Sequence, residues 1–293
     1  MTNLPTAAAR SAAPPTPTGA MEVLRALAAQ AATAAGAELL ARFRGDRRVT
    51  SKRTRTDLVS DADRVAEDTI VELLVAHRPG DGVIAEEGSR RHSTTGISWV
   101  VDPLDGTTNY LYGDHEWSVS VAAVDSSGTL AAAVLAPTTG RLFTATRGGG
   151  AWEGQERLSC SGTDQLALAL VLAGLDYDAR VRRQQMAVFT DLTGQVRDIR
   201  RHGSAALELC RVAEGSADAY LESPIQWWDI AAGVLIAEEA GAVVAADDLG
   251  GPRRSVFASA PGIDAALRDW LLGHAPAFAY LAGAEHARPE AAQ

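Results

Sequence analysis

Two aspartates three positions apart stand in the segment WVVDPLDGTTN, residues 99–109. Asp102 ends an apolar run that predicts a buried strand, Pro103 restricts the backbone, and Asp105 falls in the turn that follows. At an effective dielectric constant of about 20, two unit charges about 4 Å apart repel by about 4 kcal/mol. Glu86 or Asp229 would deepen this penalty, so the cluster needs protons or metal cations to neutralise it.

The donor types indicate which cation and which ligand this segment would bind. Carboxylates without histidine or cysteine are hard oxygen ligands, which indicate Mg²⁺ rather than zinc. In the run Gly106-Thr107-Thr108, glycine permits close backbone approach, and free N–H groups at a helix start suit a phosphate. A simple β-turn is the alternative, because Asp, Pro and Gly all favour turns. The fixed residues of DPxDGT rarely occur together by chance, so we expect a metal and phosphate site.

Composition and charge limit the function classes. The chain has 293 residues, of which 46% are hydrophobic and 22% are charged, as is typical of a globular protein with a sizeable core. The formal net charge of −10 argues against a nucleic-acid partner, which would need a basic face. Cys160 and Cys210 form neither a disulfide framework nor a zinc-ligand spacing, so we expect a cytoplasmic protein. No apolar run approaches the ~20 residues of a membrane span, so we expect no membrane partner.

The first half of the chain predicts two helices and an antiparallel sheet. Apolar residues at helical spacing indicate the helices, and short apolar runs between turn residues indicate the strands. The expected helices cover residues 21–45 and 60–77, the strands cover 82–87 and 98–102, and an antiparallel meander covers 117–152.

The second half alternates strands and helices. The expected strands cover 166–174, 196–201 and 218–222, the helices cover 179–193, 203–215 and 227–241, and two short strands and a helix at 263–272 follow. We therefore predict a layered sandwich of the α+β or α/β class, with an N-terminal half over 21–155 and a C-terminal α/β half over 156–275. Residues 1–20 and 276–293 are expected to be disordered tails, and a cleft is expected near residue 155.

Two motifs together resemble those of a known enzyme family. DPLDGTTN, followed far downstream by WDIAAGVLIAEEAG, resembles the inositol monophosphatase family of Mg²⁺-dependent, lithium-sensitive phosphatases. Two weaker segments, DLVSDADRVAE at 57–67 and IAEEGS at 84–89, stand in the family's order, and the resemblance covers residues 21–275. It implies an alternating layered sandwich related to fructose-1,6-bisphosphatase, and a homodimer.

The resemblance implies a role for each acidic residue of these motifs. Two or three Mg²⁺ ions would be held by Glu86, Asp102, the backbone carbonyl of Leu104, Asp105 and Asp229. Asp63 and Thr107 would orient the attacking water, and Glu86 would count among the catalytic groups. Without the resemblance, Glu86 is a solvated loop carboxylate, and Asp63 and Asp229 are charges in the first turn of a helix.

The resemblance also implies a small phosphorylated polyol as the substrate. The phosphate would lie against Asp105, Gly106, Thr107 and Thr108, and the sugar ring against Ala205 and Glu222. Glu222 would accept hydrogen bonds from vicinal hydroxyls, and its alternative is a surface charge at a strand end. We expect hydrolysis of inositol-1-phosphate by a metal-activated water, with histidinol-phosphate phosphatase or fructose-1,6-bisphosphatase activity as alternatives. A regulatory, protein-binding member with vestigial catalysis is the alternative from another class.

Overall fold

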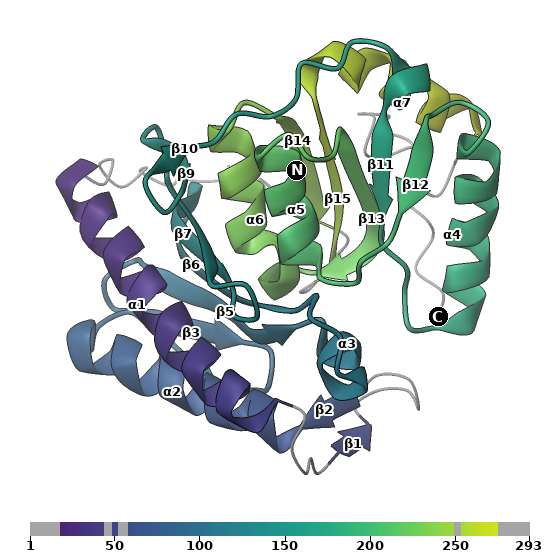
Figure 1. The fold of residues 1–293 in the computed structure, drawn as a ribbon. Helices are drawn as coiled ribbons and strands as arrows, with labels where there is room; N and C mark the ends of the chain where they lie inside the picture. The colour runs from purple at the N-terminus through teal and green to yellow at the C-terminus, as the bar shows by residue number, and fades with distance from the viewer. Residues whose placement is uncertain (1–17, 44–48, 52–57, 249–252, 275–293) are drawn as a thin grey trace, which may run out of the picture.

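The computed structural model describes residues 18–43, 49–51, 58–248 and 253–274. Its α-helices are α1 (Thr18–Arg42), α2 (Asp61–His77), α3 (Thr107–Tyr112), α4 (Ala179–Leu192), α5 (Ala205–Ala213), α6 (Trp227–Glu239) and α7 (Pro261–His274). Figure 1 shows α5 and α6 between two sheets. α1 and α2 cover the outer face of the first sheet, and α4 and α7 cover the outer face of the second. The predicted layered sandwich of helices and sheets is confirmed.

The first sheet has eight strands in the order β10-β9-β8-β7-β6-β5-β3-β4. They are β3 (Gly82–Ala85), β4 (Arg90–Arg91), β5 (Ser98–Asp105), β6 (Ser118–Asp125), β7 (Gly128–Ala136), β8 (Arg141–Thr146), β9 (Gly150–Glu153) and β10 (Glu156–Arg157). β3 pairs with β5 in parallel, which departs from the antiparallel sheet expected for this half. The other neighbours are antiparallel, and β6 to β9 form the predicted meander. β1 (Val49–Ser51) and β2 (Leu58–Ser60) form a separate antiparallel pair.

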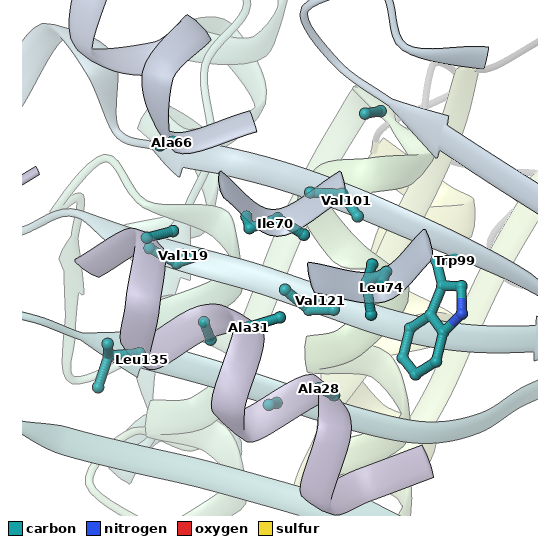
Figure 2. Packing of buried hydrophobic residues seen from close by; sticks show 14 of the residues in the cluster. Ala28, Ala31, Ala66, Ile70, Leu74, Trp99, Val101, Val119, Val121 and Leu135 are labelled. Carbon is teal, nitrogen blue, oxygen red and sulfur yellow. The ribbon is translucent and has the colours of Figure 1, made fainter. Parts of the chain in front are cut away.

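Successive side chains of β5 point to opposite faces of this sheet, which gives it a core on each side. Trp99 and Val101 pack with α1 and α2, whereas Val100 packs with α5 and α6. Ala28 and Ala31 of α1, labelled in Figure 2, are buried in the same cluster as Trp99. Their small side chains let α1 pack close to the strands, so that α1 covers this face of the sheet at high packing density.

The second sheet has five strands in the order β12-β11-β13-β15-β14. They are β11 (Leu170–Ala173), β12 (Asp198–Arg200), β13 (Ala219–Gln226), β14 (Val243–Asp248) and β15 (Arg253–Ser259). β11 runs parallel to β12 and β13, and β15 runs antiparallel to β13 and β14. Leu235 of α6 packs toward the first sheet, and Ile230 and Val234 pack toward the second. Burial on two sides explains why α6 is apolar almost all round.

Some element ends differ from the sequence-based expectations. Residues 166–168 form a 3₁₀ turn, η1 (Leu166–Leu168), and not the start of the strand expected over 166–174. The reason is pairing: β12 and β13 begin opposite Leu170 and Val171, so the preceding residues have no neighbouring strand. β5 continues to Asp105 instead of ending at residue 102. α1 begins at residue 18 and ends at residue 42, and the expected stop at Gly45 lies outside the described residues.

The chain passes from the first sheet to the second between residues 157 and 166. α5 and α6 pack on the first sheet through one apolar cluster and on the second sheet through another, and the division near residue 155 stays a prediction. The expected tail 276–293 and residues 1–17 of the other tail lie outside the described residues. None of the described helices is long and apolar enough to cross a membrane.

Candidate active site

A pocket of about 560 Å³ is lined by residues from both sheets and from α5 and α6. Of the residues expected at the site, it is lined by Glu86, Asp102, Leu104, Asp105, Gly106, Thr107, Ala205, Glu222 and Asp229. Asp63 and Thr108 are not among its lining residues. The fold therefore brings residues from distant parts of the chain to one pocket.

The end of β5 turns both of its aspartates toward this pocket. Residues 102 and 105 are an odd number of positions apart, so a regular strand would point them to opposite faces. The β5–β6 register shifts between Asp102 and Asp105, and Pro103 has no N–H to add to the ladder. The N–H of Leu104 donates instead to Oδ1 of Asp102 at 2.9 Å. This irregular turn lets both carboxylates line the same pocket.

Burial and mutual repulsion make these carboxylates hard to ionise. The pKa of Asp102 is raised well above its ordinary value by burial, by the nearby charges of Glu86, Asp105 and Asp229, and by a hydrogen bond with Glu86. Burial also raises the pKa of Asp229, and the charges of Glu86 and Asp105 add to the rise. In this structure, a shared proton between Glu86 and Asp102 is one way to relieve the repulsion.

Asp105 joins the first sheet to the beginning of α5. Its Oδ2 accepts hydrogen bonds from the Ser204 hydroxyl at 2.7 Å and from the Ala206 N–H at 2.8 Å. Burial raises the pKa of Asp105 to about 7, although these hydrogen bonds act in the opposite direction. Ser204 is also the N-cap of α5, where it accepts from the Leu207 N–H. The Asp105 carboxylate is therefore held at the beginning of α5.

Thr107 and Asp63 meet behind the pocket wall. The Thr107 hydroxyl lies 3.3 Å from Oδ1 of Asp63 and 3.1 Å from the carbonyl oxygen of Leu104. Both side chains are buried, and Asp63 stands in the first turn of α2. Gly106, with φ +90°, caps α3, and a Cβ there would lie 2.9 Å from the Glu116 carbonyl oxygen. The expected pair of Thr107 and Asp63 is thus in contact.

Asp229 has a structural role in addition to facing the pocket. It is the third residue of α6, and its Oδ2 accepts the Gln226 N–H at 3.1 Å as part of a capping box. The first-turn interpretation is therefore correct for its position. The same carboxyl group lines the pocket and interacts with Glu86 and Asp105.

Glu222 lies in the pocket, and the surface-charge alternative for it is wrong. Its Oε2 accepts a hydrogen bond from the Tyr220 hydroxyl at 2.5 Å. Burial raises the pKa of Glu222 to about 7, while Tyr220 and Arg201 act in the opposite direction. Its carboxyl group also packs on Gly174, because a Cβ there would come within 1.7 Å of Oε2. This side chain is therefore held in place on two sides.

Sequence patterns do not identify several residues that build this site. The segment LDYDAR matches no motif, yet Tyr177 lines the pocket and forms a side-chain hydrogen bond with Thr108. Ser204 carries a recognisable signal, since a serine before an apolar helix is a typical N-cap. Its contact with Asp105 depends on the tertiary structure alone.

The donor set suits a hard divalent cation. Carboxylate oxygens and a backbone carbonyl are the ligands that Mg²⁺ takes in proteins, and a cation would neutralise groups that raise one another's pKa. In the part of the chain that the structure describes, no group of three or more His, Cys, Asp or Glu side chains is already arranged to hold a metal ion. The chemistry of the donors therefore agrees with a metal site, while the side chains converge without forming a finished coordination shell.

Comparisons with known proteins agree with this arrangement. The sequence profile of the inositol monophosphatase family matches residues 20–275. An inositol-1-monophosphatase of Mycobacterium leprae is 42% identical over 231 residues, which are 75% of this chain and 79% of that protein. A protein of Xylella fastidiosa named Nus factor SuhB is 40% identical over 194 residues, covering 66% of this chain and 70% of that protein.

Comparison of the fold with solved structures finds proteins of the same kind. The crystal structure of the extragenic suppressor protein suhB from Bartonella henselae has a TM-score of 0.79 and 32% sequence identity. The match covers 85% of this chain and 98% of that chain. With a family profile over most of its length, relatives at this identity and the expected metal-binding carboxylates in one pocket, the chain belongs to the inositol monophosphatase family.

Proposed function

We propose that this protein is a Mg²⁺-dependent phosphomonoesterase that hydrolyses a small polyol phosphate, with inositol-1-phosphate as its substrate. The observation that carries the proposal is the convergence of Glu86, Asp102, Asp105 and Asp229 on one pocket, where burial and neighbouring charges raise the pKa values of the three aspartates. Such an arrangement is costly unless it serves to bind cations. Family membership and the relative named inositol-1-monophosphatase support the same reaction.

The metal-binding groups in this proposal are Glu86, Asp102, the Leu104 carbonyl, Asp105 and Asp229. When bound there, two or three Mg²⁺ ions would supply charge for the phosphate and lower the pKa of a water. The Leu104 carbonyl oxygen lies 3.1 Å from the Thr107 hydroxyl, and its two lone pairs allow another partner.

Thr107 and Asp63 orient the attacking water in the proposed reaction. In this reaction the single O–H of Thr107 donates its hydrogen bond to the Asp63 carboxylate, which leaves the lone pairs of Oγ1 to accept a hydrogen bond from water. This directs a lone pair of the water toward phosphorus. The N–H groups of Gly106 and Thr107 donate to the phosphate oxygens, whose charge grows during the displacement.

Glu222 and Ala205 form the polyol side of the pocket. Tyr220 occupies Oε2 of Glu222, so Oε1 can accept hydrogen bonds from vicinal hydroxyls of the substrate. A carboxylate that accepts two neighbouring hydroxyls favours a polyol over an apolar leaving group. In this proposal, the protein acts in the cytoplasm as a homodimer.

The experiment that tests this proposal measures released phosphate from inositol-1-phosphate, histidinol phosphate and fructose-1,6-bisphosphate side by side. Activity with inositol-1-phosphate that requires Mg²⁺, disappears with EDTA and is lost in Asp102→Asn supports the proposal. Near-normal activity of Asp102→Asn contradicts the metal assignment. A value of kcat/KM for histidinol phosphate or fructose-1,6-bisphosphate about tenfold above that for inositol-1-phosphate contradicts the substrate.

The relative named Nus factor SuhB favours a second candidate, a regulatory protein-binding function. A protein with only vestigial catalysis is expected to have lost metal-binding carboxylates. In this chain Glu86, Asp102, Asp105 and Asp229 are all present and line one pocket. Absence of turnover on the whole substrate panel at saturating Mg²⁺ would support the regulatory candidate over the enzyme.

A further inference from the structure

Glu67 is a buried carboxylate of α2 that none of the assigned roles uses. Its side chain is 3% exposed. Oε2 accepts the backbone N–H of Glu87 at 2.7 Å, and Oε1 accepts the backbone N–H of Ser89 at 2.9 Å. Both carboxylate oxygens are therefore occupied by the short segment that carries Glu86.

Backbone hydrogen bonds also attach this segment to the first sheet. The Glu86 N–H donates to the Val101 carbonyl oxygen of β5 at 3.1 Å, and the Ala85 N–H donates to the Ser89 carbonyl oxygen at 3.0 Å. These bonds hold the backbone to the sheet up to residue 86 and close the turn on itself. The bonds to Glu67 hold the next residues to α2, so the backbone is held on both sides of Glu86.

Asp63 and Glu67 lie on the same face of α2, because residues four positions apart are one helical turn apart. Asp63 contacts the Thr107 hydroxyl, and Glu67 contacts the turn after β3. Ala66 and Ile70, labelled in Figure 2, are fully buried and hold α2 in the core of the first sheet. One rigid helix thus holds two separate parts of the site at a set spacing.

We infer that Glu67 is a positioning residue that sets the direction of Glu86 toward the metal-binding pocket. The inference rests on the proposed function, since it gives Glu86 the role of a metal ligand. Glu67 does not touch the substrate or the metal in this account, and it acts through the backbone of residues 87 and 89. Residues that orient a metal ligand in this way change metal affinity by about 10–100-fold when they are replaced.

The test is Glu67→Gln, which keeps the shape of the side chain but replaces one acceptor oxygen with a donor NH₂ group. One of the two backbone N–H groups then loses its partner. We expect Mg²⁺ affinity, measured by titration calorimetry without substrate, to fall by about tenfold or more. Amide hydrogen exchange should become faster in the peptide that spans residues 86–89. The matched control is Glu72→Gln, at an exposed position of the same helix, which should change neither quantity.

A third variant, Glu86→Gln, distinguishes the possible failures. If Glu86→Gln weakens Mg²⁺ binding and Glu67→Gln leaves it equal to the Glu72→Gln control, the positioning role is wrong while the metal assignment stands. A lower melting temperature of Glu67→Gln with unchanged affinity also overturns the inference, since it assigns the residue to stability alone. If Glu86→Gln itself leaves Mg²⁺ affinity unchanged, the metal assignment and the positioning role both fail.

Discussion

The Ser204 hydroxyl donates to Oδ2 of Asp105 at 2.7 Å, across 99 positions of sequence. The same serine caps α5 through the Leu207 N–H, and its oxygen lies 3.0 Å from that of Ser118 on β6. One side chain therefore connects the acidic end of β5, the neighbouring strand and the first turn of α5. The end of β5 and the beginning of α5 meet at this contact.

Ser204→Ala should weaken both the helix start and the site. Loss of an N-cap serine lowers the free energy of unfolding by about 1 kcal/mol, which urea denaturation measures. Burial raises the pKa of Asp105 to about 7, and the hydrogen bond from Ser204 opposes that rise, so the pKa should increase in the variant. The acidic limb of the pH–activity profile should then move to higher pH. Ser204→Thr keeps the hydroxyl and should restore the profile; an unchanged limb in Ser204→Ala would contradict the role of this contact.

The stability of the metal-free protein should depend on pH with a defined sign. Burial raises the pKa of Asp105 to about 7 and raises those of Asp102 and Asp229 above their ordinary values. A carboxyl group with a raised pKa in the folded state contributes full stability below its unfolded pKa of about 3.9, and loses it as the pH rises through the folded pKa. Melting temperature without metal should therefore fall from about pH 4 to above pH 7.

Mg²⁺ should reverse this loss, because a cation replaces the protons that the carboxylates give up. Addition of Mg²⁺ should raise the melting temperature more at about pH 8 than at about pH 5. Asp102→Asn removes one of the charges, so its metal-free form should lose less stability with rising pH than the unmodified protein. Equal effects of Mg²⁺ at both pH values would argue against a carboxylate metal site.

Tyr220→Phe should impair recognition of the polyol more than the chemical step. The Tyr220 hydroxyl bonds to Glu222, so its loss frees that carboxylate to move and removes an interaction that lowers its pKa. We expect KM for inositol-1-phosphate to rise by about tenfold, the equivalent of one hydrogen bond of about 1.4 kcal/mol. KM for a phosphate monoester without hydroxyls should be unchanged. Tyr110→Phe is the control, because Tyr110 also uses a buried hydroxyl, bonded to the Leu39 carbonyl, but does not line the pocket.

Gly106→Ala should disturb phosphate binding. Gly106 has φ +90°, and a Cβ there would meet the Glu116 carbonyl oxygen at 2.9 Å, so the backbone before α3 must shift. We expect weaker competitive inhibition by inorganic phosphate, together with a lower kcat. Gly140→Ala pays a similar backbone cost at φ +71° but has nothing within 4 Å of the added Cβ. If both variants bind phosphate alike, the Gly106 backbone does not contribute to the phosphate site.

The local parts of the fold and site could be predicted from the sequence. Helical spacing of apolar residues indicated α1 and α2, and turn residues separated the strands of the meander. DPLDGT and WD identified Asp102, Asp105 and Asp229 because the motif residues are close together in the chain or stand at a helix start. The extent of β11 could not be predicted, because its first residue depends on where β12 and β13 begin.

By itself, the sequence determined which chemical groups are available: acidic residues, a threonine and a glycine-containing turn, with enough apolar surface to bury them. Only the tertiary structure decided that Asp102 and Asp105 line one pocket, because the register shift at the end of β5 overrides the alternation of a regular strand. It also decided that Ser204 and Glu67 hold the acidic residues in place. The physical reason is that these contacts depend on hydrogen bonds between segments far apart in the chain, which packing of the sheets and helices creates and which no local pattern encodes.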